Sequence, residues 1–382
     1  MYENTGLGVR IHRNTQSNNN STQRGLIYLG LDVAKDSIAV GILRPDEVVP
    51  DTEKIFHDEA SVRQPINRFD DPRQLRACYE AGPTGYELYR LLASIGVRTD
   101  VVAPSLIPRV PGDHVKTDRR DCRRLARLHR AGELTAIRVP TRKEEGVRDL
   151  CRARQVAVGE RRQARQRLSS FLLRHNEVYR DGATWTQRHE SWIASRRFED
   201  QPTKAGFSFY RSGVTIQDAT LGAITADLTP YFCDPLFSGP LHRLGAYRGI
   251  DHLGALSIIS EVCDFRRFGH SGAFMGFCGL VPSEYSSGAS VSRGGITHAG
   301  NVHVRTQLIE SAWAYQYGPS TGVGMKTRQN GLEKEVIDRA WHAQLRLCGR
   351  FRRLASRKDS RNVVVTAIAR ELAGFIYAEM IS

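Results

Sequence analysis

Four carboxylates in three short segments have the residue types and spacing needed for metal-dependent chemistry. Asp32 closes one apolar run and Glu80 closes another, while Asp118 and Asp121 are three positions apart and would share one face of a helix. Carboxylate oxygens are the ligands that Mg²⁺ prefers, and two such ions can activate a nucleophile and stabilise a leaving oxygen in phosphodiester chemistry. The four acids are therefore candidate ligands for two Mg²⁺ ions, with Mn²⁺ as an alternative. A structural interpretation stays open, because Asp118 and Asp121 could instead pair with the arginines at 119–124.

A run of serines nearer the C-terminus is a second candidate group. Between residues 282 and 301, glycines interleave with Ser283, Ser286, Ser287, Ser290 and Ser292. A serine hydroxyl becomes a nucleophile when a neighbouring base or metal-bound oxygen activates it. By composition alone, a flexible polar loop is the simpler interpretation of this segment. The histidines at 298 and 303 are too far apart in it to be convincing zinc ligands, and the arginine at 305 is interpreted as a phosphate contact.

The charge of the chain indicates which kind of molecule it binds. Among 382 residues, Lys and Arg outnumber Asp and Glu by 55 to 41, giving a net charge of +14. Such an excess favours nucleic acid as the partner, although a GC-rich genome would also enrich arginine. No apolar run approaches the roughly 18–20 residues of a membrane span. The first 25 residues have no apolar signal segment, and the seven scattered cysteines form no C-x-x-C pair, so we expect a reducing cytoplasm.

The elements that must position the acids are predicted over residues 26–140, after a polar tail at 1–25. Apolar, β-branched runs predict strands at 26–33 and 37–43 that form a hairpin, with further strands at 76–81 and 97–102. A helix is predicted at 86–92. Strands that alternate with helical segments indicate a layered α/β domain, in which Asp32 and Glu80 stand at strand ends.

The remaining chain is predicted to be mostly helical. Residues 141–180 have a seven-residue apolar repeat at Leu150, Ala157, Ala164 and Phe171, which predicts a basic coiled-coil segment that dimerises and lies along a nucleic acid backbone. Residues 181–245 are left as a connecting region. Residues 246–382 are expected to form a mainly α-helical C-terminal domain that carries the serine loop, a basic helix at 332–357 and an apolar helix at 363–380.

Several motifs of this sequence, in their order and spacing, resemble those of the DEDD transposases of insertion sequences, the IS110 family that also includes the Piv invertases. The similarity covers most of residues 26–320. It is carried by YLGLDVAK at 28–35, YEAGPTG at 79–85, VKTDRRD at 115–121, GLVPS at 279–283, SSG at 286–288, GGITHAGN at 294–301 and VR at 304–305.

This resemblance implies a RuvC-like, RNase H-type N-terminal domain in which the four acids are the metal-binding tetrad. It also implies that Ser287, immediately before Gly288, is the nucleophile, with Ser286 as the second choice. The serine would form a phosphoserine link to DNA and release a 3′ hydroxyl for strand exchange. Cys122 departs from the alanine that is usual at its position, but leaves the acids intact.

The partners implied are double-stranded DNA at the element ends and target, a non-coding guide RNA from the element, and further copies of the chain in a dimer or tetramer. Because the acids and the serine fall in separate domains, we hypothesise a composite site shared between subunits. The expected location is the cytoplasm of a bacterium or archaeon, near the nucleoid.

Three other functions remain open. A RuvC-like nuclease or junction resolvase would use the four acids with water as the nucleophile and leave the serines without a role. A non-catalytic nucleic-acid-binding protein, or a decayed element copy, would need neither group. An actin-like sugar kinase could also begin with a Gly-Leu-Asp strand, but we see no second glycine-rich phosphate loop, and the charge does not suit a small sugar.

Overall fold

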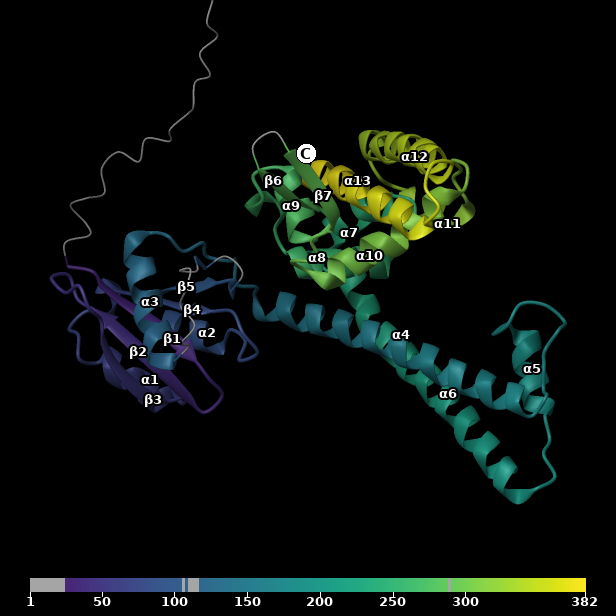
Figure 1. The fold of residues 1–382 in the computed structure, drawn as a ribbon, viewed down its shortest axis with the longest axis horizontal. Helices are drawn as coiled ribbons and strands as arrows, with labels where there is room; N and C mark the ends of the chain where they lie inside the picture. Colours follow the sequence, from purple (N-terminus) through teal and green to yellow (C-terminus); the bar gives the residue numbers. More distant parts are fainter. Residues whose placement is uncertain (1–24, 105–106, 109–116, 288–289) are drawn as a thin grey trace, which may run out of the picture. The chain divides into compact units, whose positions relative to one another are not determined.

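The computed structural model describes residues 25–104, 107–108, 117–287 and 290–382, and between 285 and 293 it describes the backbone alone. The chain divides into two compact units, one ending at Val139 and the other beginning at Pro140 (Figure 1). The first unit is mixed α/β and the second is mostly helical, which confirms the expected classes of both parts. Within the described ranges, no helix is both long and apolar enough to cross a membrane.

A five-stranded sheet forms the centre of the first unit, with strands in the order β3-β2-β1-β4-β5. Neighbours β3, β2 and β1 are antiparallel, whereas β1, β4 and β5 are parallel. The predicted hairpin is therefore confirmed. The strands are β1 (Ile27–Val33), β2 (Ser37–Leu43), β3 (Asp51–Phe56), β4 (Leu75–Glu80) and β5 (Arg98–Val102).

Helices cover both faces of this sheet. Side chains of α1 (Glu59–Ile66) and α2 (Glu87–Ser94) pack with Leu29 and Leu31 of β1 on one face. On the other face, α3 (Asp118–Ala131) packs through Leu125 and Ala126. Since successive side chains of a strand point to opposite faces, Tyr28, Gly30 and Asp32 of β1 share the face that α3 covers.

Two long helices of the second unit lie side by side as a hairpin (Figure 1). They are α4 (Arg142–Arg174) and α6 (Gln201–Leu228), with α5 (Gln187–Ser195) between them in sequence. Near their outer end Phe171 packs with Phe207, and at the other end Val147 shares a cluster with Leu228, so the pair is antiparallel. A capping box formed by Thr141 and Glu144 begins α4. The heptad pattern thus finds its partner in the same chain.

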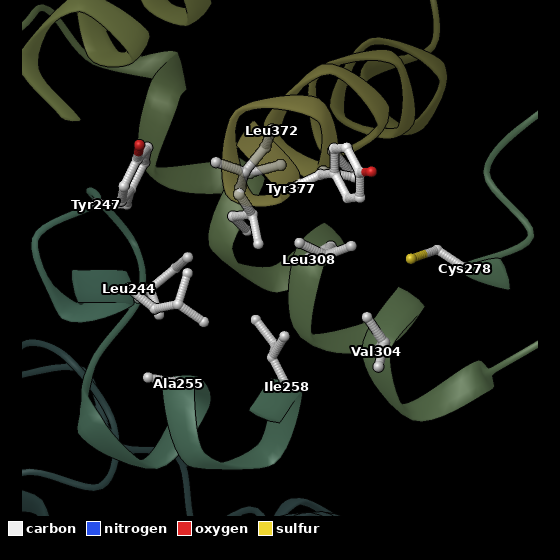
Figure 2. Packing of buried hydrophobic residues seen from close by; sticks show 14 of the residues in the cluster. Leu244, Tyr247, Ala255, Ile258, Cys278, Val304, Leu308, Leu372 and Tyr377 are labelled. Carbon is white, nitrogen blue, oxygen red and sulfur yellow. The ribbon is translucent and has the colours of Figure 1, made fainter. Parts of the chain in front are cut away.

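The rest of the second unit is a helical body with one small hairpin of strands. Apolar side chains from most of these elements form one continuous core, including Leu244, Ile258, Leu308 and Leu372 (Figure 2). The elements are α7 (Ser238–Gly245), α8 (His252–Val262), α9 (Ser271–Phe277), β6 (Pro282–Ser287), β7 (Ser290–Ile296), α10 (Val302–Ala312), α11 (Val323–Gln329), α12 (Lys334–Ala355) and α13 (Arg361–Ile381).

Candidate active site

Strand register places four residues in one row across the sheet of the first unit. Asp32 of β1 pairs with Ala39 of β2, and Ala39 pairs with Lys54 of β3. On the other side, Leu31 pairs with Tyr79 of β4, so one residue further along both strands Asp32 is level with Glu80. The row is therefore Lys54, Ala39, Asp32 and Glu80, and paired residues of neighbouring strands point to the same face.

That face is the one covered by α3. A Cβ added to Gly30, two residues before Asp32, would meet backbone atoms of α3, which shows that Gly30 faces this helix. The Cys78 thiol, two residues before Glu80, is 3.6 Å from the carbonyl oxygen of Leu125 in α3 and donates to it. With a side-chain period of two, Asp32 and Glu80 project toward α3 from the carboxyl ends of two neighbouring parallel strands.

The first turn of α3 contributes the other two carboxylates. The Oδ2 atom of Asp118 lies 3.9 Å from Nζ of Lys54, so the helix begins beside the row. The Oδ2 atom of Asp121 is buried and has no hydrogen-bond partner among the described residues. Negative charge in a first turn is stabilised by the helix dipole, which partly offsets the cost of gathering these acids.

The pKa of the Cys122 thiol depends on its surroundings beneath α3. Burial raises its pKa to about 11, and the negative charge of Asp32 acts in the same direction. The thiol donates to the carbonyl oxygen of Arg119 at 3.4 Å. Cys122 is therefore a neutral packing residue beside Asp32 at neutral pH.

The residue types around the row fit a hard divalent cation. All four acids supply oxygen donors, and the orphaned, buried Oδ2 of Asp121 is a lone-pair site that no described hydrogen-bond donor satisfies. The ligand geometry itself is not assembled: nowhere in the described part of the chain do three His, Cys, Asp or Glu side chains gather as a metal site. Carboxylates brought close together repel one another, and a bound cation would compensate their charge.

A groove of about 670 Å³ opens beside Asp118 over β2 and β3. Its lining includes Ala39, Thr52, Lys54 and Arg119. The six residues of β3, DTEKIF, are mostly polar and only partly buried. Apolar patterns in the sequence therefore predict no strand there, and this side of the site is not predicted. The available signal was the charged sequence itself, which is typical of an edge strand.

The serine segment is a β-hairpin, where a loop was expected. Ser286 and Ser287 end β6 and pair with Val291 and Ser290 of β7. At the base of the hairpin, the Ser283 hydroxyl donates to the carbonyl oxygen of Gly295 at 3.2 Å. Gly288 lies outside the described residues, as do the side chains of both candidate nucleophiles, so the role of Ser287 stays a prediction.

The interpretation of Arg305 as a phosphate contact is wrong. Its side chain is buried, 9% exposed, and Nη1 donates to the carbonyl oxygen of Cys278 at 3.0 Å. Burial of a charged side chain under a backbone carbonyl leaves it no surface to offer a phosphate. Arg305 instead fixes the start of α10 against the turn after α9.

A buried polar network holds the segment that follows the serine hairpin. Arg152 of α4 donates to both carboxylate oxygens of Glu261 in α8, at 2.6 and 2.9 Å, and Asn301 donates to Glu261 at 2.7 Å. Asn301 also caps α10 by accepting from the backbone N–H of Val304. Burial raises the pKa of Glu261, but these hydrogen bonds and the charges of Arg152 and His303 outweigh it, so the pKa lies below its ordinary value.

Comparison with known proteins identifies relatives along most of the chain. Residues 29–177 match the DEDD transposase domain of the IS110 family, and residues 241–319 match a transposase domain of the IS116/IS110/IS902 family. The protein y4qE of Sinorhizobium fredii, named as a transposase, is 41% identical over 92% of this chain and 87% of its own length. The transposase of insertion sequence element IS1533 from Leptospira borgpetersenii is 31% identical over 87% of this chain and 97% of its own length.

Proposed function

Because the chain belongs to the IS110 family of insertion-sequence transposases, we propose that it cuts and rejoins DNA through metal ions held by four acids and a covalent phosphoserine link. The observation that carries this proposal is the row across the sheet, which brings Asp32 and Glu80 to one edge and one face beneath the helix that carries Asp118 and Asp121. The orphaned Oδ2 of Asp121 supports a cation at this place.

Asp32, Glu80, Asp118 and Asp121 would hold two Mg²⁺ ions, or Mn²⁺ in their place. When bound, the ions neutralise charge on the reacting phosphate and its leaving oxygen. The rigid strand ends fix the first two carboxylates, while α3 sets the other two. Positioned charge of this kind is the main contribution that a protein can make to phosphoryl transfer.

The proposed covalent step exchanges one phosphodiester bond for another. The Oγ atom of Ser287 loses its proton and bonds to the DNA phosphorus, and the bond from phosphorus to the 3′ oxygen breaks. The 3′ oxygen leaves with a proton as a hydroxyl, and the phosphate remains on the serine. Attack on this phosphoserine by a 3′ hydroxyl of another strand restores the serine and joins the strands, so no ATP is needed.

The partners would be double-stranded DNA at element ends and target, a structured non-coding RNA from the element that selects them, and further copies of the chain in a dimer or tetramer. The net charge of +14 supports polyanionic partners. The work would take place on nucleoid DNA in the cytoplasm. Because the acids and the serine belong to different units, the proposal includes their contribution from different subunits.

A metal-dependent RuvC-like nuclease that hydrolyses DNA without a covalent intermediate is the second candidate. The observation that favours it is that all four acids belong to the first unit, so that the metal site needs no group from the second unit. Water would then take the place of the serine hydroxyl, and the serine hairpin would serve only for binding.

The test is to incubate the full chain with Mg²⁺, its flanking DNA and the element transcript, and to look for a protein–DNA adduct on a denaturing gel. We expect an adduct with wild type and with Ser286→Ala, the matched control, and none with Ser287→Ala or Asp32→Ala. Cleavage that persists in Ser287→Ala without any adduct would establish the hydrolytic nuclease instead. Mixed Asp32→Ala and Ser287→Ala subunits should regain adduct formation if the groups come from different subunits.

A further inference from the structure

Lys54 belongs to the same row as the candidate metal ligands. It pairs with Ala39, which pairs with Asp32, so all three side chains project from the face that α3 covers. Its Nζ lies 3.9 Å from Oδ2 of Asp118. The ammonium group thus stands at the acid site, on the side away from Glu80.

The ion pair between Lys54 and Asp118 is not needed to hold the fold. The two side chains are 64% and 65% exposed, and an ion pair so open to water contributes little to stability. Arginines attach α3 to this side of the sheet instead: Arg119 donates to the Thr52 hydroxyl at 2.8 Å, and Arg123 donates to the carbonyl oxygen of Pro50 at 3.0 Å. Lys54 is therefore free to exchange Asp118 for another anion at low cost.

The space for that anion is the groove beside Lys54 and Asp118. Neighbouring strands are about 4.8 Å apart, so two strand spacings separate Lys54 from Asp32 by roughly 10 Å, with Ala39 between them in the row. The groove of about 670 Å³ opens over Ala39, and the rest of its lining is Thr52, Glu53, Lys54, Thr117, Asp118 and Arg119. Glu53 is neutralised by an ion pair with Arg68 at 2.8 Å. Such a gap, with a cation on one side and carboxylates on the other, suits a phosphate bound between the ammonium and a metal ion.

We propose that Lys54 binds the DNA phosphate at the acid site and that, without DNA, its ammonium holds the place of a cation at Asp118. This inference rests on the proposed function, because the phosphate is that of the DNA bound there. If Asp118 held a divalent cation, the Lys54 ammonium would be released from this carboxylate and could donate to a phosphate oxygen. Lysine suits the exchange, since its charge sits at the end of a flexible chain.

Two measurements on the full chain test this assignment, with Lys54→Gln, Lys54→Arg and a control, Arg73→Gln. Arg73 is also exposed and ion-paired, to Asp71 at 3.0 Å. It precedes β4, so it lies near the amino end of that strand, whereas Glu80 lies at the carboxyl end. The first measurement is affinity for a duplex of the element end at several salt concentrations in Ca²⁺, a hard cation that oxygen ligands bind. The second is Mg²⁺ binding without DNA, by calorimetry.

For Lys54→Gln we expect the slope of log affinity against log salt to fall by about 0.9, the loss of one phosphate contact. We also expect Mg²⁺ to bind several-fold more tightly without DNA, because a competing cation is gone. Lys54→Arg should keep the wild-type salt slope, and Arg73→Gln should change neither quantity. A role in stability alone would move neither the salt slope nor the Mg²⁺ affinity.

Failure of this inference differs from failure of the proposed function. If Asp118→Asn weakens Mg²⁺ binding while Lys54→Gln leaves the salt slope and the Mg²⁺ affinity unchanged, Lys54 is not a phosphate ligand and the metal site stands. If Asp118→Asn and Asp121→Asn leave Mg²⁺ binding unchanged, the metal site is wrong and the assignment of Lys54 falls with it. A lower salt slope together with tighter Mg²⁺ binding in Lys54→Gln supports the inference.

Discussion

Gly30 of β1 lies directly beneath Cys122 of α3, so closely that an added Cβ would be 2.2 Å from the Cys122 carbonyl oxygen. A Cβ added to Gly41 of β2, which pairs with Gly30, would be 2.7 Å from the same carbonyl oxygen. Two adjacent glycines therefore form a hollow in the sheet that admits the backbone of the helix. This close approach sets the height at which Asp118 and Asp121 stand above the row of Asp32 and Glu80.

Replacing Gly30 with alanine should push α3 off the sheet. The clash involves backbone atoms of both elements, which cannot turn away as a side chain can, so we expect a loss of about 3 kcal/mol in the stability of the first unit. Hydrogen exchange of β1 and α3 peptides measures it. Gly222→Ala in α6 is the control, because its added Cβ meets nothing within 4 Å among the described residues, and alanine there should stabilise by up to about 1 kcal/mol. Unchanged protection in Gly30→Ala would contradict the proposed contact.

The seam between α4 and α6 should be sensitive at buried heptad positions and insensitive beside them. Leu221 is 6% exposed and in the row of Phe207, Val214 and Leu228, so Leu221→Ala should cost about 2–5 kcal/mol. Ile216 on the same helix is 60% exposed, and Ile216→Ala should stay within about 0.5 kcal/mol of wild type. Urea unfolding followed by tryptophan fluorescence suits the comparison, since all four tryptophans lie in the second unit. Equal costs for the two variants would argue against this packing.

Acid should weaken the second unit through Glu261. Its pKa in the folded chain lies below the ordinary value of 4.5, so its charge stabilises the folded state above that pH and the contribution is lost as the pH falls below it. Glu261→Gln should cost about 2 kcal/mol near neutral pH, because Arg152 loses its carboxylate partner while keeping partial contact with water. Urea midpoints between pH 7 and pH 3 should fall less steeply in the variant. Parallel curves would show that Glu261 does not carry this acid sensitivity.

Asp121→Asn should separate metal binding from folding. The buried Oδ2 of Asp121 has no hydrogen-bond partner among the described residues, so removing its charge should leave stability without metal unchanged or higher by up to about 1 kcal/mol. The stabilisation that Mg²⁺ gives to the wild type should disappear, because bound ligand stabilises only the state that binds it. Thermal unfolding with and without Mg²⁺ measures both effects. Asp46→Asn, a turn residue after β2, is the control and should keep the Mg²⁺ response.

The sequence predicted well those elements whose apolar pattern is local. The hairpin expected at 26–33 and 37–43 is β1 and β2, and the coiled-coil segment expected at 141–180 contains α4. It missed α6, although Phe207, Val214, Leu221 and Leu228 repeat every seven residues, because glycines and polar residues between them weaken the helical signal. The heptads of α4 therefore predicted a partner without showing that it lay in the same chain.

The same limit applies to the candidate site. Asp32 and Glu80 could be placed at strand ends from their own segments, whereas Lys54 becomes their neighbour only through the registers of β1 with β2 and of β2 with β3. Pairing of this kind depends on contacts between distant segments, which no local pattern contains. The prediction that Arg305 contacts phosphate failed for a related reason. Its burial depends on the packing of α10 against the turn after α9, which the sequence around it does not indicate.

The outer strands of the sheet also determine whether the protein pairs with other molecules through its sheet edges. At the carboxyl end of β5, Ala136 bridges to Val102, and the N–H of Ile137 donates to the carbonyl oxygen of Val101, so part of that edge already has a partner. The opposite edge, β3, carries Asp51, Glu53 and Lys54, and charged side chains on an edge strand discourage pairing with another molecule. Neutralising those charges should therefore change the stability of the folded chain little. It should increase the tendency of separate chains to aggregate through β3.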